Sequence, residues 1–470
     1  MKRKSKLYIA IGCSIALVAL IVAVLGIVRN TDTTDPTYPP LLDAADIYDQ
    51  AVAEVNAQKS ICATVSYIKE TTIGAEVFRE NSQQQLLYEN TGAEEFRSYV
   101  TESLTAGTHT VEITELYDDG QCYFTVEGIP FRCQLTPEDY LARYTPITPI
   151  NPEIYGSIDG IERNGEKVIS FRHAAAPEDW AIPESCTLQY AEGTAYLSKE
   201  GQLKKSVYII SYTTGNAFVK YSVSVELQLD STQTIPAPSD IQTYTPVEYI
   251  DGPRTLEIAS GHLMDCGNID AAYLEKIHCQ LFGDLRTTEI SMQTNHTNGW
   301  FAQVDTTVTV ENTGKTGSIS TKHQTEQFQN NTYSVHVDDV DSTENQEVSK
   351  NDMRSYCQDI LVSTVVLPEY ISNVSVTQTQ TTLQLQFHTN DDFAQLLKSE
   401  ALTYLYQNPA ILQDKEYHAQ TALCYLHIDK STLLPVASGF QLTGNYTVDD
   451  LDYPLTYSAD QNYQLYKTEH

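Results

Sequence analysis

The chain has 470 residues, of which 41% are hydrophobic and 31 are tyrosine, so it can form packed cores and is not a disordered polymer. Its formal net charge is −33 at pH 7, and residues 1–29 hold five basic and no acidic residues, so the remainder carries −38. Such a surface repels phosphate backbones, which argues against nucleic-acid binding. A chain of this length is expected to form two domains.

The N-terminus predicts a membrane anchor. Residues 7–28 contain no charged side chain, and as a helix they span about 33 Å, enough to cross a bilayer core of roughly 30 Å. Four basic residues precede this stretch, namely Lys2, Arg3, Lys4 and Lys6. The positive-inside bias therefore predicts a cytoplasmic tail at 1–6, a transmembrane signal anchor in the bilayer at 7–28, a tether at 29–40 and an extracytoplasmic remainder at a bacterial cell surface.

Two alternatives for the N-terminus remain open. A cleaved signal peptide would have a shorter apolar region, and no small-residue cleavage site closes this one. The sequence Ala10-Ile11-Gly12-Cys13 resembles a degenerate lipobox, which would place a lipid on Cys13. All three interpretations leave the bulk of the chain outside the cytoplasm.

The first half of the remainder, 41–230, is expected to be rich in β-strands. Leu41–Ala57 is amphipathic and predicts a helix, and Thr136-Pro137-Glu138-Asp139 predicts the start of a short helix through Tyr144. Ile61–Thr71 is typical of a strand. Tyr221–Leu229 alternates apolar and polar residues with a period of two, which indicates an antiparallel sheet with one face on a core.

Eight cysteines follow the anchor, four in each half, and none forms a CxxC pair, so a zinc knuckle is not expected. A two-residue turn at Glu127-Gly128 would place Cys122 directly opposite Cys133, within disulfide reach. We therefore predict a Cys122–Cys133 disulfide, with free buried thiols as the alternative.

The stretch 231–253 is rich in proline and lacks an apolar period, so we expect a linker there and a second β-rich domain at 254–470. In that domain Val304–Val310 and Leu383–Phe387 alternate as strands do, and Asn298-Gly299 predicts a hairpin turn. Two further helices are predicted, at Asp270–Phe282 and from a cap at Asn390 to Leu402.

The two halves show weak internal similarity. Tyr196-Leu197 and Tyr425-Leu426 lie 229 positions apart, as do Thr214-Gly215-Asn216 and Thr443-Gly444-Asn445. Ile169–His173 resembles Leu385–His388 in the same order. The shared offset favours two tandem copies of one domain.

No motif indicates catalysis, a cofactor or a metal. Ser66-Tyr67-Ile68-Lys69 fits the SxxK pattern, but that chemistry needs a helix and this segment is typical of a strand. Asp338–Glu344 resembles a calcium loop, yet Glu344 occupies the position of its invariant glycine. The chain is therefore predicted to be non-enzymatic.

The order of elements, an initial helix, several meandering strands, Asp118-Asp119-Gly120-Gln121-Cys122-Tyr123, a short helix and a late strand pair, resembles the LolA/LppX-like lipoprotein-carrier fold. The resemblance implies a mainly β (α+β) architecture in which a curved, incompletely closed antiparallel sheet wraps one or two helices, and some members hold acyl chains in the hollow. It implies no catalytic residues.

We therefore expect a membrane-anchored extracytoplasmic binding protein for a lipid, a lipoprotein or another envelope ligand. The face of one strand with Val304, Val308 and Val310 is expected to line the hollow of the second domain, because its alternation leaves one apolar face. An envelope hydrolase with a site assembled only by folding and a structural surface protein are the alternatives.

Overall fold

The computed structural model describes residues 38–465 except 90–94, 142, 144–156, 173–185, 230–232, 267, 282–283, 298–300, 313–317, 330–331, 338–345, 406–415 and 449. The predicted transmembrane segment 7–28 lies outside these residues. Within them, no helix has the length and apolar character needed to cross a bilayer.

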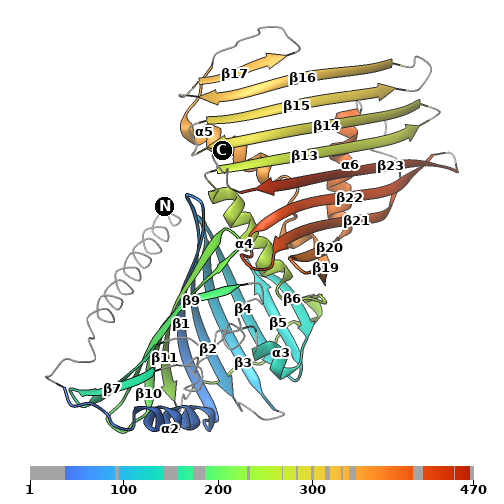
Figure 1. The fold of residues 1–470 in the computed structure, drawn as a ribbon. Helices are drawn as coiled ribbons and strands as arrows, with labels where there is room; N and C mark the ends of the chain where they lie inside the picture. Colours follow the sequence, from blue (N-terminus) through green and yellow to red (C-terminus); the bar gives the residue numbers. More distant parts are fainter. Residues whose placement is uncertain are drawn as a thin grey trace.

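The protein is mainly β and consists of two curved, open sheets joined at α4 (Figure 1). The elements of the first half are α2 (Ala44–Asn56), β1 (Ser60–Ile73), β2 (Glu76–Glu89), β3 (Arg97–Ala106), β4 (His109–Asp118), β5 (Gln121–Val126), β6 (Ile129–Gln134), α3 (Pro137–Leu141), β7 (Ser157–Arg163), β8 (Glu166–Arg172), β9 (Thr187–Leu197), β10 (Leu203–Thr214) and β11 (Ala217–Leu229). A short 3₁₀ turn, η3 (Ile241–Thr243), and β12 (Thr245–Pro246) follow.

The elements of the second half are α4 (Gly252–Asp265), β13 (Asn268–Leu281), β14 (Asp284–Thr297), β15 (Phe301–Asn312), β16 (Ser318–Gln329), β17 (Thr332–Val337), β18 (Gln346–Glu347), α5 (Lys350–Val362), η4 (Pro368–Tyr370), β19 (Ile371–Gln378), β20 (Thr382–Thr389), α6 (Asp391–Leu405), β21 (Glu416–Asp429), β22 (Pro435–Val448) and β23 (Leu451–Gln464).

The two sheets have the same topology. The first runs β12-β6-β5-β4-β3-β2-β1-β11-β10-β9-β8-β7, and the second β18-β17-β16-β15-β14-β13-β23-β22-β21-β20-β19. In each sheet, the first six strands of the half form a meander that extends from one edge of the first strand. The last strand of the half pairs with the other edge of that first strand. Strands β1–β11 therefore correspond one by one to β13–β23, once the added β12 is set aside.

The predicted internal similarity is met only in part by this correspondence. Tyr196 on β9 and Tyr425 on β21 lie on equivalent strands, and so do Ile169 on β8 and Leu385 on β20. The Thr-Gly-Asn matches are not equivalent, because the first forms the turn after β10 and the second lies inside β22. The strand order, more than the shared tripeptides, shows the repeat.

Tight turns fix the register of the hairpins. Glu127 and Gly128 have φ values of 51° and 80°, as a two-residue type I′ turn between β5 and β6 requires. Asp119-Gly120 joins β4 to β5 in the same way, with φ values of 48° and 74°. The turn predicted at Glu127-Gly128 is thus confirmed, and Cys122 pairs with Cys133 in register.

Most predicted elements are present, and one is wrong. The helices predicted at Leu41–Ala57, after Thr136 and after Asn390 correspond to α2, α3 and α6. Asp270–Phe282 was predicted to be a helix but forms β13, where Ile269, Ala271 and Tyr273 begin an alternation of buried residues. Pairing with β14 and β23 on both sides outweighs local helix propensity there.

The stretch predicted as a linker lies against the first sheet. Ile235 packs with Leu87 and Leu116, and β12 pairs in parallel with β6. The predicted boundary at 253/254 falls inside α4, which sequence reasoning missed together with α5. The division into independently folding domains stays a prediction.

Candidate functional site

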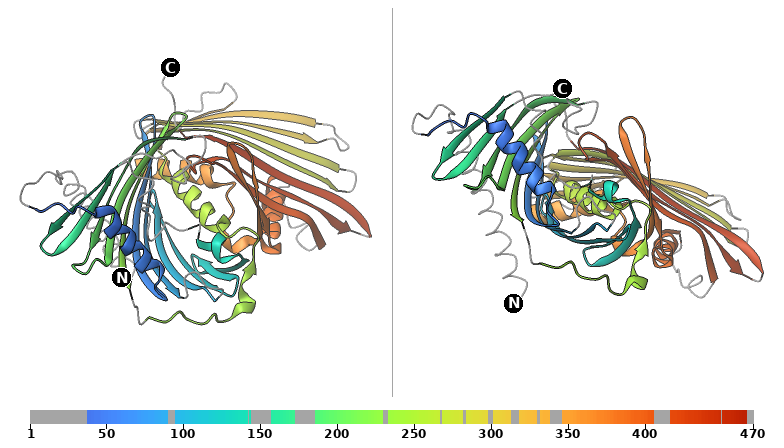
Figure 2. Two further views of the ribbon diagram at one scale, coloured as in Figure 1. Left: turned by 60° about the horizontal axis from the view of Figure 1, so that its bottom comes forward. Right: turned by 90° about the horizontal axis from the view of Figure 1, so that it is seen from below.

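Helix α4 lies between the two sheets and packs on both. Pro253 at its first turn and Leu256, Ala259 and Leu263 at helical spacing favour the helix, and all four residues are buried. It packs on β2, β3 and β4 of the first sheet and on β19 and β22 of the second. Figure 2 shows the strands of the first sheet curving around it.

The contact of α4 with the second sheet repeats one made by α2. Helix α2, the equivalent of α4, packs on β7 and β10 of its own sheet, and these strands correspond to β19 and β22. The contact of α4 with β2–β4 is therefore an additional one, made across the junction of the two repeats.

Close backbone packing brings α4 to the sheet. A side chain at Gly261 would clash with the backbone oxygen of Ala106, and one at Gly107 would clash with the side chain of Asp265. Glycine at these two positions lets the helix approach the β3–β4 turn.

The first half of α4 is held by Arg254. Its Nη2 donates to Oε1 of Glu102 at 2.7 Å and to the Tyr67 hydroxyl at 3.1 Å. Ser82 and Gln84 also donate to Oε1 of Glu102, at 2.6 and 3.0 Å. Burial opposes the charge on Arg254, but Glu102 raises its pKa well above the ordinary value.

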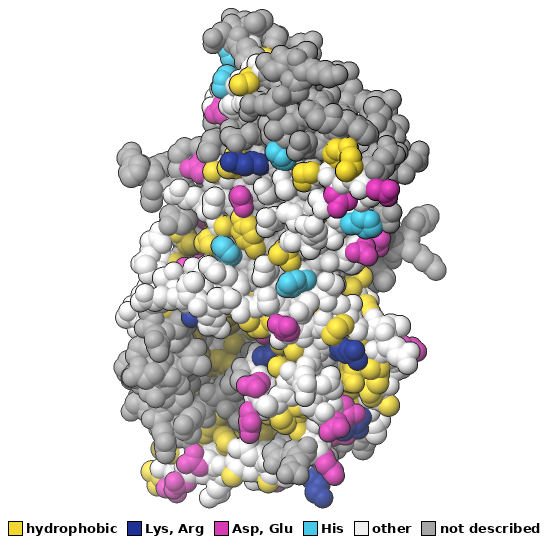
Figure 3. All heavy atoms as spheres, turned by 90° about the vertical axis from the view of Figure 1, so that its right-hand side faces the viewer, with side chains coloured by type: hydrophobic (Ala, Val, Ile, Leu, Met, Phe, Trp, Pro, Cys, Tyr) yellow, Lys and Arg dark blue, Asp and Glu magenta, His cyan; other side chains and the backbone are white. Residues whose placement is uncertain are grey.

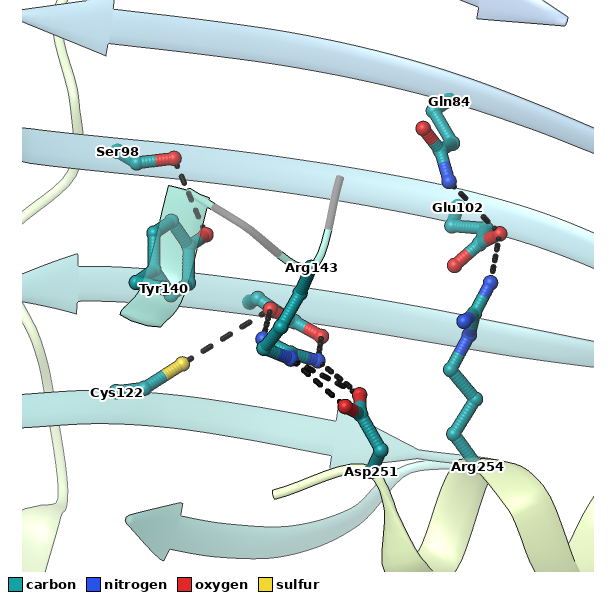
Figure 4. A network of polar contacts seen from close by, with 9 residues as sticks. Gln84, Ser98, Glu102, Cys122, Tyr140, Arg143, Asp251 and Arg254 are labelled. Atoms are coloured by element: carbon teal, nitrogen blue, oxygen red, sulfur yellow. Dashed lines mark hydrogen bonds and ion pairs between the residues drawn. The ribbon is translucent and has the colours of Figure 1, made fainter. Parts of the chain in front are cut away.

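A second arginine joins the start of α4 to the sheet (Figure 4). Arg143, just after α3, donates to both carboxylate oxygens of Glu115, each at 3.0 Å. Its Nε donates to both oxygens of Asp251, at 2.9 and 3.1 Å. Burial alone would raise the pKa of Asp251, but Arg143 lowers it below the ordinary value.

Two contacts between a histidine and a glutamate also join α4 to the first sheet. His262 Nε2 lies 3.2 Å from Glu80 Oε1, which also accepts from Lys69 Nζ at 2.7 Å, and all three residues are buried. Although burial raises the pKa of Glu80, Lys69 and His262 lower it overall. On the facing strand β4, His109 Nε2 lies 2.5 Å from Glu257 Oε2.

These ion pairs and hydrogen bonds hold α4 in position on the first sheet. The carboxylates of Glu80, Glu102 and Glu115 each accept from a basic side chain, so none of the three is left as an unpaired general base. Within the described part of the chain, no group of three or more His, Cys, Asp or Glu side chains could hold a metal ion.

In the second sheet, the residues equivalent to those around Arg254 and Glu102 have different side chains. The hairpins β1–β2 and β13–β14 close at Ile73↔Glu76 and Leu281↔Asp284, which sets the equivalence of their residues. By that register, Glu275 takes the position of Tyr67, Ile290 that of Ser82 and Met292 that of Gln84. The register of the third strands places Thr306 at the position of Glu102. Two of these four positions, those of Ser82 and Gln84, are therefore taken by apolar residues in the second sheet.

Glu275 is a buried acidic residue on the equivalent face of the second sheet. Its side chain accepts a hydrogen bond from the Tyr273 hydroxyl at 2.6 Å on Oε2, and the residue is 3% exposed. No described residue donates to Oε1. Burial raises the pKa of Glu275, and the nearby Glu400 of α6 raises it further, while Tyr273 and Tyr457 act in the opposite direction.

The predicted lining residues share this face by register. Val308 lies opposite Ile290, which lies opposite Glu275, so the three stand in one row across β15, β14 and β13. Val304 and Val310 have the same parity on β15, and Val304 is fully buried. Their role as ligand lining stays a prediction.

Cys122 and Cys133 face one another on the core side of β5 and β6 and are both free thiols in this structure. Burial raises the pKa of each. Because Cys122 lies 3.9 Å from Glu115, the pair adjoins the Arg143 contacts. The disulfide stays a prediction.

Sequence reasoning missed the α4 network because Arg254 and Asp251 stand at the edge of a proline-rich stretch. A signal was nevertheless present. Glu80, Glu102, Glu115 and Glu275 all stand at buried positions of alternating strands, and a charged residue at such a position needs a partner.

The first sheet also carries a groove of about 480 Å³, which is lined mainly by residues of the face opposite α4. Its walls are mostly hydroxyl and amide side chains from β1, β2, β3 and β11, such as Thr64, Ser66, Gln83 and Ser103. On the face drawn in Figure 3, hydrophobic side chains also line a hollow in the lower half, and acidic side chains are scattered singly.

No family model and no curated protein matches this chain. It is similar to the crystal structure of LprF from Mycobacterium bovis, at 13% identity and a TM-score of 0.25, over 42% of this chain and 98% of LprF. It is also similar to a DUF1329 family protein from Desulfovibrio piger, at 11% identity and a TM-score of 0.17, over 41% of this chain and 95% of that one. At these TM-scores neither likeness assigns a function.

Proposed function

We propose that this chain is a membrane-tethered, non-enzymatic binding protein at a bacterial cell surface, which holds an apolar ligand on the concave face of its second sheet. One observation carries the proposal. The first sheet holds α4 on the face of β2–β4, and on the equivalent face of the second sheet the apolar residues Ile290 and Met292 stand at the positions of Ser82 and Gln84.

Apolar side chains on this face would expose a hydrophobic surface unless something covers it. Helix α6 packs on β13 and β14 and on β21–β23, and Figure 1 shows it crossing that sheet. Its buried residues Phe393, Leu397 and Leu402 are apolar. An acyl chain lying beside α6 on β14 and β15 would complete the cover.

The first test is ligand binding by the fragment of residues 30–470, which keeps every described element. Native mass spectrometry should detect a co-purified lipid, and the neutral dye Nile red should bind and be displaced by added acyl chains. Val308→Asp should abolish dye binding, because it places a charge in the row with Ile290.

Thr309→Asp is the matched control, since it lies next to Val308 on the other face of β15, and it should leave dye binding unchanged. Equal loss in both variants, or no dye binding by a folded wild-type fragment, would favour a structural surface protein. Hydrolysis of an added ester or peptide would favour the hydrolase alternative.

The anchoring part of the proposal has its own test. Protease added to intact cells should digest residues beyond 30, because the basic residues before residue 7 would hold the N-terminus in the cytoplasm. Protection of those residues would overturn the extracytoplasmic location.

A further inference from the structure

We propose that the ligand of the second sheet carries a primary ammonium head group and that Glu275 binds it. The inference rests on the proposed function and adds the chemical class of the ligand, an amphipathic amine. Three observations carry it: the equivalence with the Arg254 site, the unpaired oxygen of Glu275, and the neighbouring carboxylate of Glu400.

The internal repeat supplies a template for the site. In the first sheet, the guanidinium of Arg254 donates to Tyr67 and Glu102 on the concave face of β1 and β3. In the second sheet, Glu275 takes the place of Tyr67, and Thr306 that of Glu102. The second sheet thus keeps one acidic residue in the region where the first sheet binds Arg254. This residue is Glu275 on the first strand of the second sheet, whereas in the first sheet it is Glu102 on the third strand.

One oxygen of Glu275 has no donor among the described residues. Tyr273 donates to Oε2 and Tyr457 also hydrogen-bonds the carboxyl group, while Oε1 is buried and receives no hydrogen bond. A buried acceptor left without a donor costs about 1–3 kcal/mol, so a ligand that donates to it gains that contribution. The row Glu275, Ile290, Val308 then places an acyl chain directly beyond the head group.

The charges around Glu275 select a cation. Glu400 on α6 is close enough to raise the pKa of Glu275, so a carboxylate or phosphate head would be repelled by both groups. Lys398, the basic residue nearest in sequence on α6, lies over the Tyr417 ring at 5.9 Å. Lys322 stands at the far end of the row, beyond Val308, and donates to Gln324.

Access to Glu275 requires α6 to move, because the helix packs on β13 and β14 and the carboxyl is almost fully buried. A ligand beside the shifted helix would keep the apolar face out of water and would add the donor that Oε1 lacks.

The experiment measures displacement of Nile red from the 30–470 fragment by dodecylamine, dodecanol and dodecanoate, which share one chain length. The amine should bind about ten-fold or more tightly than the alcohol, as expected for a hydrogen bond to a charged group, and the carboxylate most weakly. Glu275→Gln should bring the amine to the affinity of the alcohol and leave the alcohol unchanged.

Glu289→Gln is the matched control, because Glu289 neighbours Ile290 on the other face of β14, and it should keep the amine preference. Equal affinities for amine and alcohol in the wild type would overturn this inference while the proposed function stands. No displacement by any of the three would overturn both. Binding of a lysine-bearing apolar helical peptide but not of the amine would replace the lipid by a protein partner.

Discussion

At the scale of single residues, the buried ion pairs around α4 set the strength of the junction. Glu102 has a side chain only 3% exposed, and among the described residues Arg254 is the only charged side chain that pairs with it. Removing the arginine therefore leaves a carboxylate buried beside two neutral donors, Ser82 and Gln84.

Arg254→Met should lower the free energy of unfolding by about 3–5 kcal/mol, the usual cost of leaving one member of a buried pair. The double variant Arg254→Met/Glu102→Gln should recover most of this loss, because the buried charge is gone. Lys205→Met is the control: its pair with Glu226 is exposed, so the loss should stay below about 1 kcal/mol. Urea denaturation measures all three, and a similar loss in both single variants would contradict the buried pairing.

The His109–Glu257 contact makes the junction depend on pH. The hydrogen bond with Glu257 raises the pKa of His109 above 6.5, although burial acts in the opposite direction. A raised pKa in the folded state means that the contribution of His109 to stability is complete below about pH 6.5 and is lost as pH rises through the folded value.

His109→Gln should therefore reduce the melting temperature more at about pH 5.5 than at about pH 8.5. His278→Gln, at a half-buried residue of β13 with no recognised ion pair among the described residues, should show no such difference between the two pH values. Thermal denaturation in matched buffers checks this. A His109→Gln effect that grows toward high pH would have the wrong sign for the proposed ion pair.

At the scale of elements, α4 depends on close approach to the β3–β4 turn. Gly261 has no room for a side chain against Ala106, so Gly261→Leu should push the helix off the first sheet. The expected result is a lower urea midpoint and faster tryptic cleavage at Arg254. Ile258→Leu, which conserves volume on the same helix, should leave both unchanged. Unaltered proteolysis of Gly261→Leu would show that the contact is not needed.

At the scale of the whole molecule, α4 belongs to the second repeat by topology and covers the first sheet by contact. One hydrophobic cluster accordingly includes Val225 of β11, Leu256 of α4 and Leu442 of β22. We propose that α4 stabilises the fold of the first half.

The fragment 30–266 should unfold at a higher urea concentration than the fragment 30–253, because the shorter one lacks Arg254 and leaves the buried carboxylate of Glu102 without it. Circular dichroism followed through the transition measures the difference. Equal midpoints would favour the boundary drawn from the sequence, at 253/254.

The sequence by itself determined what is local. Alternation at Tyr221–Leu229 and Val304–Val310 predicted strands and their buried faces, because a period of two is a property of the strand alone. Glu127-Gly128 predicted a type I′ turn and hence the pairing of Cys122 with Cys133. Caps at Thr136 and Asn390 predicted two helix starts, since capping needs only neighbouring residues.

Only the tertiary structure decided what depends on residues far apart in the chain. Asp270–Phe282 looked helical until two neighbouring strands paired with it. The partners of Arg254 lie more than 150 positions away, at Glu102 and Tyr67. Whether one oxygen of a buried acid such as Glu275 lacks a donor is likewise a property of the assembled sheet, because burial and hydrogen bonding are set by packing across strands.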